Sequence, residues 1–207
     1  MMKASDLSLA FIAFRRSTMP HAGSLDRLMP FSPEVLAVVR AWFSDPDVQQ
    51  WLGGPSWPDV LLSLRQSGTA GHGYRGATVI GAKAFVLLDA RDTPVALVDT
   101  ECYDRETRFV GHGEDGPVFD DVPGPHRPLA ALSVVVDPDR RRQGFGRAAI
   151  QAVVAHPDLA MVDRFVAAIE PGNAGSQALF RAAGFWLLDP EPDWEGMLTY
   201  VRDRPSP

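Results

Sequence analysis

This chain has few cysteines, no excess of basic residues and no long apolar run near its start, and each of these features would indicate a particular class of protein. Its 207 residues include one cysteine, Cys102, so no internal disulfide can form, and we expect a reducing, cytoplasmic location. Basic residues are outnumbered, 20 Lys and Arg against 26 Asp and Glu, which argues against general binding to nucleic acid or an anionic membrane. This balance suits a cationic small-molecule substrate. The apolar run 7–14 is far too short to span a bilayer and lacks a signal-peptide cleavage pattern.

Size and composition predict one folded domain. With 45% hydrophobic residues, the chain can bury one sizeable core but not readily two. We therefore divide it into an N-terminal extension, residues 1–23, and one α/β domain, residues 24–207. We assign no metal ligands, and the sequence leaves the oligomeric state open, a homodimer included.

The first part of the domain is expected to hold an edge strand and helices. Residues 28–31 predict a strand at a sheet edge, where a proline is tolerated. Ser32 and Pro33 then begin a helix with apolar residues near the 3.6-residue period. The stretch 47–66 has two tryptophans around a Gly-Gly-Pro turn and predicts one or two short helices.

Two apolar, β-branched runs, 84–90 and 94–103, flank a polar turn and predict a β-hairpin. In the second run, period-two alternation puts Asp99 and Glu101 on one face. A strand end that emerges into solvent would also explain these acids. The connection 104–128 is rich in Gly, Pro and acids, and it predicts either a mobile lid over a cationic substrate or, as we favour, a solvated insertion.

The most informative stretch is 129–154, LAALSVVVDPDRRRQGFGRAAIQAVV. Residues 129–136 predict a buried central strand, and the helix 145–155 follows a loop of arginines and glycines. The first N–H groups of a helix lack intrahelical partners and carry the positive end of its dipole, so they stabilise an anion. Because Gly144 and Gly146 have no Cβ, a phosphate could approach the backbone closely. The loop therefore predicts a phosphate site.

The C-terminal part completes the predicted sheet. Residues 164–170 predict a strand splayed from its neighbour, and Asn173 is expected to cap a helix that Gly184 ends. The runs 185–189 and 197–201 predict a closing antiparallel pair.

Two motifs resemble the GNAT acetyltransferase superfamily. The spacing Arg141-x-x-Gly144-x-Gly146, with Pro138 six residues before the first glycine, resembles its acyl-CoA pyrophosphate loop. The block 173–185, NAGSQALFRAAGF, lies about where that family places its next helix.

A third segment, 28–54, is similar to the N-terminal part of aminoglycoside 6'-N-acetyltransferase-like members. The resemblance covers nearly all of residues 28–202. It implies a mixed sheet of about six to seven strands flanked by helices, with acetyl-CoA in a V-shaped opening between the strands 129–136 and 164–170.

The resemblance also implies roles for individual residues. Backbone groups of Val134 and Val136 would hold the pantetheine and the acetyl carbonyl, and Asn173 would contact the donor near its sulfur or serve as a helix cap alone. Trp51 and Trp57 would form an acceptor wall, unless their indoles only pin a loop to the core. The pyrophosphate would lie on the loop residues Arg141, Arg142, Gln143, Gly144, Phe145, Gly146 and Arg147.

Acyl transfer to an amine requires a proton acceptor. With a lysine-like pKa near 10.4, roughly one amine in two thousand is neutral at pH 7. A carboxylate on the cleft face can act as general base. Glu101 and Asp99 are the leading candidates, because their strand neighbours the donor strand in the family fold. Glu170 is a third, because EPGN resembles the order of residues at the corresponding strand end of aminoglycoside-type members.

One departure from the family concerns the leaving thiolate. Many members have a tyrosine seven residues after the asparagine, where this chain has Phe180. Tyr103 or Tyr200 would substitute, water would protonate the thiolate, or turnover would be slow. We favour an N-acetyltransferase that acts on a small cationic amine or an aminoglycoside in a ternary complex. The alternatives are a protein or peptide N-terminal acetyltransferase and a non-catalytic acyl-CoA-binding domain.

The same glycines also fit the dinucleotide-binding fingerprint G-x-G-x-x-A, from Gly144 to Ala149. Three observations argue against it. Seven residues separate Val136 from the first glycine, arginines crowd the turn, and the motif lies in the last third of the chain, not near the start of a βαβ unit.

Overall fold

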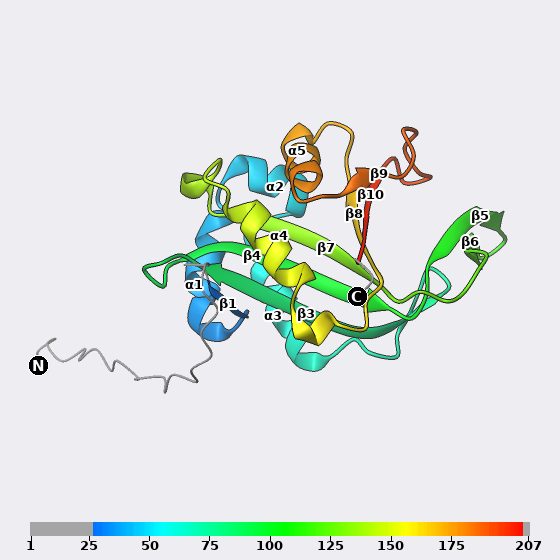
Figure 1. Ribbon diagram of the computed structural model, residues 1–207, viewed down its shortest axis with the longest axis horizontal. Helices are drawn as coiled ribbons and strands as arrows, with labels where there is room; N and C mark the ends of the chain where they lie inside the picture. Colours follow the sequence, from blue (N-terminus) through cyan, green and yellow to red (C-terminus); the bar gives the residue numbers. More distant parts are fainter. Residues whose placement is uncertain (1–26, 205–207) are drawn as a thin grey trace, which may run out of the picture.

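An eight-stranded mixed sheet forms the centre of the molecule (Figure 1). The computed structural model describes residues 27–204, so the predicted extension 1–23 and its apolar run lie outside the described residues. In spatial order the strands are β1 (Arg27–Pro30), β3 (Ala77–Leu88), β4 (Pro94–Tyr103), β7 (Leu129–Val136), β8 (Arg164–Ile169), β10 (Leu198–Asp203) and β9 (Trp186–Leu187), and the short β2 (Gly73–Tyr74) pairs with β3.

Helices cover both faces of this sheet. The helices are α1 (Pro33–Trp42), α2 (Pro46–Leu52), α3 (Trp57–Ser67), α4 (Phe145–Val154) and α5 (Ala174–Ala182). Helices α4 and α5 pack on one face around Ile150, Phe165 and Tyr200, whereas α1 and α3 pack on the other around Phe43. Strand β4 serves both clusters because its side chains alternate, with Val98 in the first and Leu97 in the second.

The predicted mixed α/β sheet is confirmed, and so are most of its elements. The hairpin of β3 and β4 is present, although β3 begins earlier than predicted, at Ala77. Strand β1 pairs only with β3, so Pro30 lies at an edge where its missing N–H costs nothing. Among the described strands only β7 and β8 run parallel. This topology excludes the doubly wound dinucleotide-binding fold, which is built from consecutive parallel strands.

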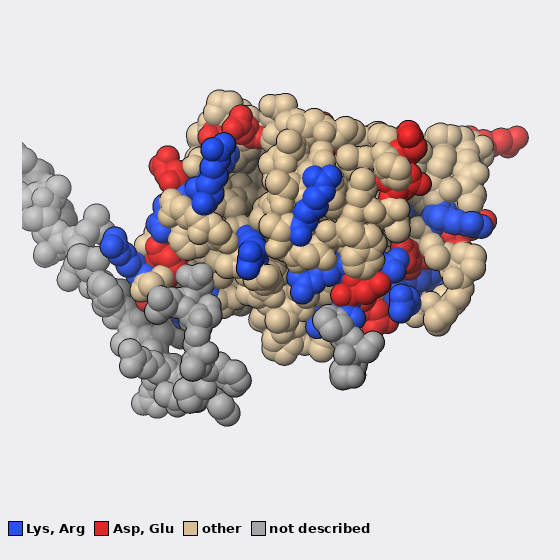
Figure 2. All heavy atoms as spheres, turned by 45° about the horizontal axis from the view of Figure 1, so that its top comes forward, with Lys and Arg blue, Asp and Glu red and all other residues tan. Residues whose placement is uncertain are grey.

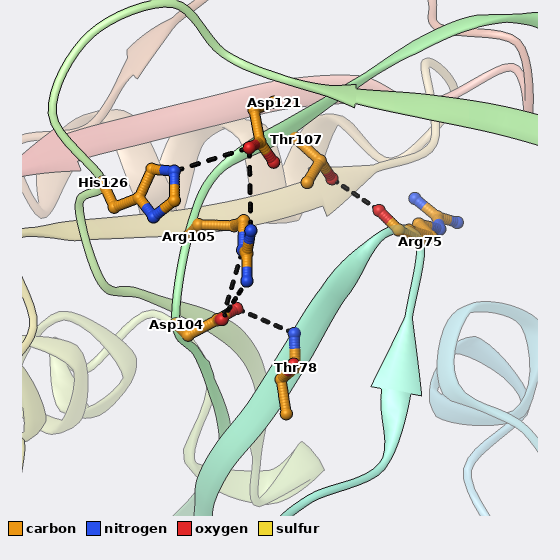
Figure 3. A network of polar contacts seen from close by, with 7 residues as sticks. All are labelled: Arg75, Thr78, Asp104, Arg105, Thr107, Asp121 and His126. Carbon is orange, nitrogen blue, oxygen red and sulfur yellow. Dashed lines mark hydrogen bonds and ion pairs between the residues drawn. The ribbon is translucent and has the colours of Figure 1, made fainter.

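The connection 104–128, which we favour as a solvated insertion over a mobile lid, forms a second hairpin, β5 (Thr107–Gly113) with β6 (Gly116–Asp121). A polar network ties its base to the main sheet (Figure 3). The Asp104 carboxylate accepts hydrogen bonds from the Thr78 N–H at 2.7 Å and from Arg105 at 2.7 Å. Arg105 also lies 3.6 Å from Asp121.

Aromatic side chains hold the same hairpin at a second point. The rings of Phe109 and Trp194 stack with centroids 5.0 Å apart, although Trp194 lies between β9 and β10. Arg75 lies 5.6 Å from the centroid of the Trp194 ring and forms an ion pair with Glu195. The hairpin is therefore fastened at two places and is not a free lid.

The two parallel strands diverge, as the splay predicted for residues 164–170 requires. Pairing of β7 with β8 is confined to their first residues, Leu129 with Arg164 through Ala131 with Val166. Beyond that point β8 continues to pair with β10 along its whole length. The described part of the chain contains no helix long and apolar enough to cross a membrane.

Candidate functional site

A cleft of about 800 Å³ opens where β7 and β8 diverge. Its volume lies within the range of small-molecule and cofactor sites. The second half of β7, the β7–α4 loop and the start of α4 line one side, and the end of β8 with the start of α5 lines the other. Of the predicted site residues, ten line this cleft: Val134, Val136, Arg141, Arg142, Gly144, Phe145, Gly146, Arg147, Glu170 and Asn173.

Gly144 and Gly146 have different structural roles in the loop. Gly144 is the N-cap of α4 with a φ of +89°, a left-handed conformation that favours glycine, and a Cβ there would meet no atom within 4 Å. At Gly146 a Cβ would lie 3.0 Å from side-chain atoms of both Leu179 and Val136. Open space in the Cβ direction is therefore present at Gly144 only, because at Gly146 that direction is filled where α4 packs against α5 and β7.

The arginines of the loop also divide into two groups. Arg140 pairs with Asp89 at 3.1 Å and lies over the Phe145 ring. Arg141 has two ion pairs of its own, described below. Arg142 and Arg147 are exposed and form no ion pair with any described residue. Positive charge that remains available to an anion at this loop therefore comes chiefly from these two.

Gln143 differs from its neighbours because it does not line the cleft. Its Oε1 accepts a hydrogen bond from Arg140 at 3.2 Å. The side chain thus belongs to the outer side of the loop.

Asn173 both caps α5 and lines the cleft, so the two predicted roles are compatible. Its Oδ1 accepts a hydrogen bond from the Ser176 N–H at 3.0 Å. Glu170 directly follows β8 and is exposed at the rim of the cleft. Phe180, one helical turn beyond Ser176, is buried and packs edge-on against Phe185 at 5.0 Å.

The two acids of β4 lie one strand away from the cleft and do not line it. Asp99 is the cross-strand partner of Ser133, a residue that does line it. Both carboxylate oxygens of Asp99 accept hydrogen bonds from Arg65, at 2.7 and 2.8 Å, and both side chains are largely buried. Burial raises the pKa of Asp99, and the Arg65 guanidinium opposes that rise.

Glu101 has a different partner. Its Oε2 accepts a hydrogen bond from the Tyr103 hydroxyl at 3.1 Å. Burial, together with the Glu101 charge, raises the pKa of Tyr103 well above its usual value. Sequence reasoning found both acids but missed Arg65, since nothing in a helical segment indicates which carboxylate a distant arginine will meet.

Neither tyrosine proposed to replace Phe180 reaches the cleft. The Tyr200 hydroxyl donates to Gln177 Oε1 at 3.2 Å within the core, and the Tyr103 hydroxyl is bound to Glu101. Among the described residues that line the cleft, the side-chain hydroxyls belong to Ser133 and Ser176.

Helix α2 forms part of the cleft wall, and the two tryptophans lie in different places. Trp51 lines the cleft, and its Cη2 would lie 3.4 Å from a Cβ on Gly172, so the indole covers the β8–α5 turn. Trp57 instead stacks on Phe43 with centroids 5.1 Å apart. The first is a wall residue and the second is pinned to the core.

Charges of both signs are interspersed on one face of the molecule (Figure 2). On the face in Figure 2, Lys and Arg side chains lie among Asp and Glu side chains and do not gather in one patch. Over residues 27–204, no group of three or more His, Cys, Asp or Glu side chains is arranged to hold a metal ion.

Comparisons with known proteins find relatives in sequence and in fold. An uncharacterized N-acetyltransferase of Bacillus subtilis strain 168, YfmK, is 41% identical over 70 residues, which cover 34% of this chain and 47% of that protein. The chain therefore matches about half the length of this curated relative.

Solved structures share the fold at low identity. An aminoglycoside acetyltransferase, AAC(6')-Ib in complex with coenzyme A, has a TM-score of 0.59 and 16% identity, with 86% of this chain and 95% of that chain covered. A spermidine N-acetyltransferase SpeG chimera from Vibrio cholerae and hSSAT has a TM-score of 0.56 and 14% identity, with 87% and 96% covered. The profile of the acetyltransferase (GNAT) domain matches residues 27–186, and the chain belongs to this family.

Proposed function

We propose that this protein transfers an acetyl group from acetyl-CoA to a primary amine of a small cationic metabolite or an aminoglycoside, by direct attack in a ternary complex. The observation that carries the proposal is the opening between β7 and β8. Past Ala131, the backbone of β7 on this side has no described strand partner. An extended ligand with amide groups can pair with such an edge, as a peptide adds to a sheet. The pantetheine arm of acetyl-CoA has this chemistry.

The loop at one end of the opening suits the donor's phosphates. The first N–H groups of α4, at Phe145, Gly146 and Arg147, have no intrahelical acceptor and point toward the loop. Exposed Arg142 and Arg147 add charge. Val134 and Val136 of β7 would then hold the rest of the donor, with Asn173 on the opposite wall.

The donor, when bound, supplies a thioester carbonyl and a thiolate leaving group. The chain's own task is to take a proton from the acceptor ammonium. Glu170 is at the cleft rim, and Glu101 lies one strand away with one oxygen not bound to Tyr103. Asp99 has both oxygens engaged by Arg65. We therefore assign the role of proton acceptor to Glu170 or Glu101. Asp99 would have a supporting role.

The acidic side chains also suit a cationic acceptor. Two similar structures are named as acetyltransferases of an aminoglycoside and of spermidine, which are amines. The named acceptors support this substrate class without deciding among its members.

One observation favours a second candidate function, a non-catalytic acyl-CoA-binding domain. No tyrosine lines the described cleft, so the leaving thiolate has no phenolic proton donor and must take its proton from water. Free thiols titrate near 8.5, which makes this route adequate but not fast. A non-catalytic acyl-CoA-binding domain would show the same cleft.

The test is calorimetric titration with acetyl-CoA, followed by thiol release against aminoglycosides, polyamines and peptides. Binding with release on a small amine is expected. Binding without release on any amine would favour the non-catalytic domain, and absence of binding would refute the acyl-CoA site.

Amide variants then identify the base. Glu170→Gln or Glu101→Gln, whichever removes the base, should lower kcat on the order of a hundredfold or more with acetyl-CoA affinity retained. Asp99→Asn is the matched comparison on the same strand as Glu101. Unchanged kcat in all three variants would show that none of these carboxylates is the base.

A further inference from the structure

We propose that Arg141 is a positioning residue of the acceptor wall and not a ligand of the donor's phosphates: its guanidinium fastens α2 across the mouth of the cleft. This inference rests on the proposed function, because it assigns one residue of that site to one of the two substrates. It also departs from the expectation that every arginine of the loop serves the pyrophosphate.

Two ion pairs hold the guanidinium in place. Arg141 Nη2 lies 2.7 Å from Asp45 Oδ1, and Arg141 Nη1 lies 3.1 Å from Asp47 Oδ2. Both terminal nitrogens of the guanidinium therefore already face a carboxylate. These two carboxylates more than neutralise the charge of the one guanidinium, so a phosphate would have to displace an acid to bind Arg141.

Asp45 is built into the helix that it anchors. It is the N-cap of α2, and its Oδ1 also accepts a hydrogen bond from the Val48 N–H at 3.1 Å. Although burial alone would raise the pKa of Asp45, the hydrogen bonds from Arg141 and Val48 and the Arg141 charge hold it below its usual value. The carboxylate thus stays ionised and keeps both partners at neutral pH.

Helix α2 touches both sides of the opening. Its start is tied to the β7–α4 loop through Arg141, and its end places Trp51 over Gly172 in the β8–α5 turn. Val48 anchors it in the core under α1 and α3. A helix of seven residues is not stable by itself, so its position depends on such ties. Loss of the Arg141 tie would therefore displace the wall that Trp51 contributes.

The neighbouring arginine provides a matched contrast. Arg142 lines the same cleft, is exposed, and forms no ion pair with any residue from 27 to 204. Its side chain is free to meet a phosphate, whereas that of Arg141 is not.

The experiment compares Arg141→Gln with Arg142→Gln in the full chain. Arg141→Gln should leave the acetyl-CoA Kd within about threefold of wild type and accelerate hydrogen exchange across α2 on the order of tenfold. It should also raise the acceptor KM by a similar factor, for the amine found in the thiol-release panel. Arg142→Gln should instead raise the acetyl-CoA Kd by about tenfold and leave α2 exchange unchanged.

Two further variants distinguish loss of the Arg141–Asp45 ion pair from a general loss of stability. Asp45→Asn preserves an N-cap oxygen for Val48 but removes the charge, so it should reproduce the faster α2 exchange of Arg141→Gln. The double variant should be no worse than Arg141→Gln alone, because Arg141→Gln already breaks the pair with Asp45. Arg141→Lys, which keeps one charge, should restore part of the protection.

One result would contradict the inference about Arg141. If Arg141→Gln weakened acetyl-CoA as much as Arg142→Gln does and α2 exchange were unchanged, Arg141 would be a phosphate ligand and the inference would be wrong. A wild-type protein that binds acetyl-CoA but releases no thiol would refute the proposed function instead. The exchange and affinity measurements would still decide whether Arg141 ties α2.

Discussion

At the scale of single residues, Gly146 shows how closely packing and binding are linked at the β7–α4 loop. A Cβ at this position would lie 3.0 Å from Val136 Cγ2 and from Leu179 Cδ2. The leucine methyl can turn away, but the valine is β-branched and stiff on its strand. Alanine favours a helix by up to about 1 kcal/mol, whereas overpacking costs about 1–3 kcal/mol. We expect the overpacking to prevail.

Gly146→Ala should therefore lower the free energy of unfolding by about 1 kcal/mol, which is a fall in Tm of roughly 2–4 °C for a domain of this size. Urea denaturation measures it. Gly54→Ala, where a Cβ meets nothing within 4 Å, should stay within about 0.5 kcal/mol of wild type. A Gly146→Ala protein as stable as wild type would mean that Val136 yields freely.

At the scale of elements, the β5–β6 hairpin depends on charge at its base. Hydrogen bonds from Arg105 and from the Thr78 N–H hold the pKa of Asp104 below its usual value. A carboxyl group with a lowered folded-state pKa stabilises the fold above its unfolded value, about 3.9, and this contribution is lost as the pH falls through the folded-state pKa.

Asp104→Asn should accordingly lower the free energy of unfolding by about 1 kcal/mol at pH 7, and the difference should shrink below a pH of about 4. Urea titrations at several pH values measure it. Asp115→Asn at the exposed tip, where the carboxylate makes no ion pair in the described chain, is the control. An Asp104→Asn deficit that is equal at pH 3 and pH 7 would contradict the electrostatic account.

At the scale of the whole molecule, the two apolar clusters are joined through one sheet. Strands β3, β4 and β7 each contribute residues to both clusters. If the helices on one face detached, they would expose strands that also support the cluster on the other face. We expect one cooperative unfolding transition.

Phe165→Ala tests this coupling from one face. The side chain is fully buried in the cluster that includes Ile150 and Tyr200, so its loss should cost about 3–5 kcal/mol. Far-UV circular dichroism and tryptophan fluorescence, to which Trp42 and Trp57 of the other face contribute, should shift to the same new midpoint. Leu188→Ala, at an exposed site, should move neither. Separate midpoints for the two signals would indicate layers that unfold independently.

Local patterns in the sequence determined much of this protein. The strand β7, the helix α4, the Asn173 cap of α5 and the glycine that ends α5, Gly184, were all predicted where the structure has them. Each depends on apolar periodicity, on a cap or on a glycine within a few residues of chain, and such interactions survive in almost any tertiary setting. The family followed from two such motifs.

Only the tertiary structure decided which of these residues are free to act. Arg65 meets Asp99 across 34 residues, Arg141 meets Asp45 across 96, and Arg75 meets Glu195 across 120. The β5–β6 hairpin and the close packing at Gly146 likewise depend on contacts between distant segments. Many pairings of charges and rings are compatible with one sequence pattern, and only the packing of the whole sheet selects among them. The sequence therefore determined the parts of the site, and the fold determined their partners.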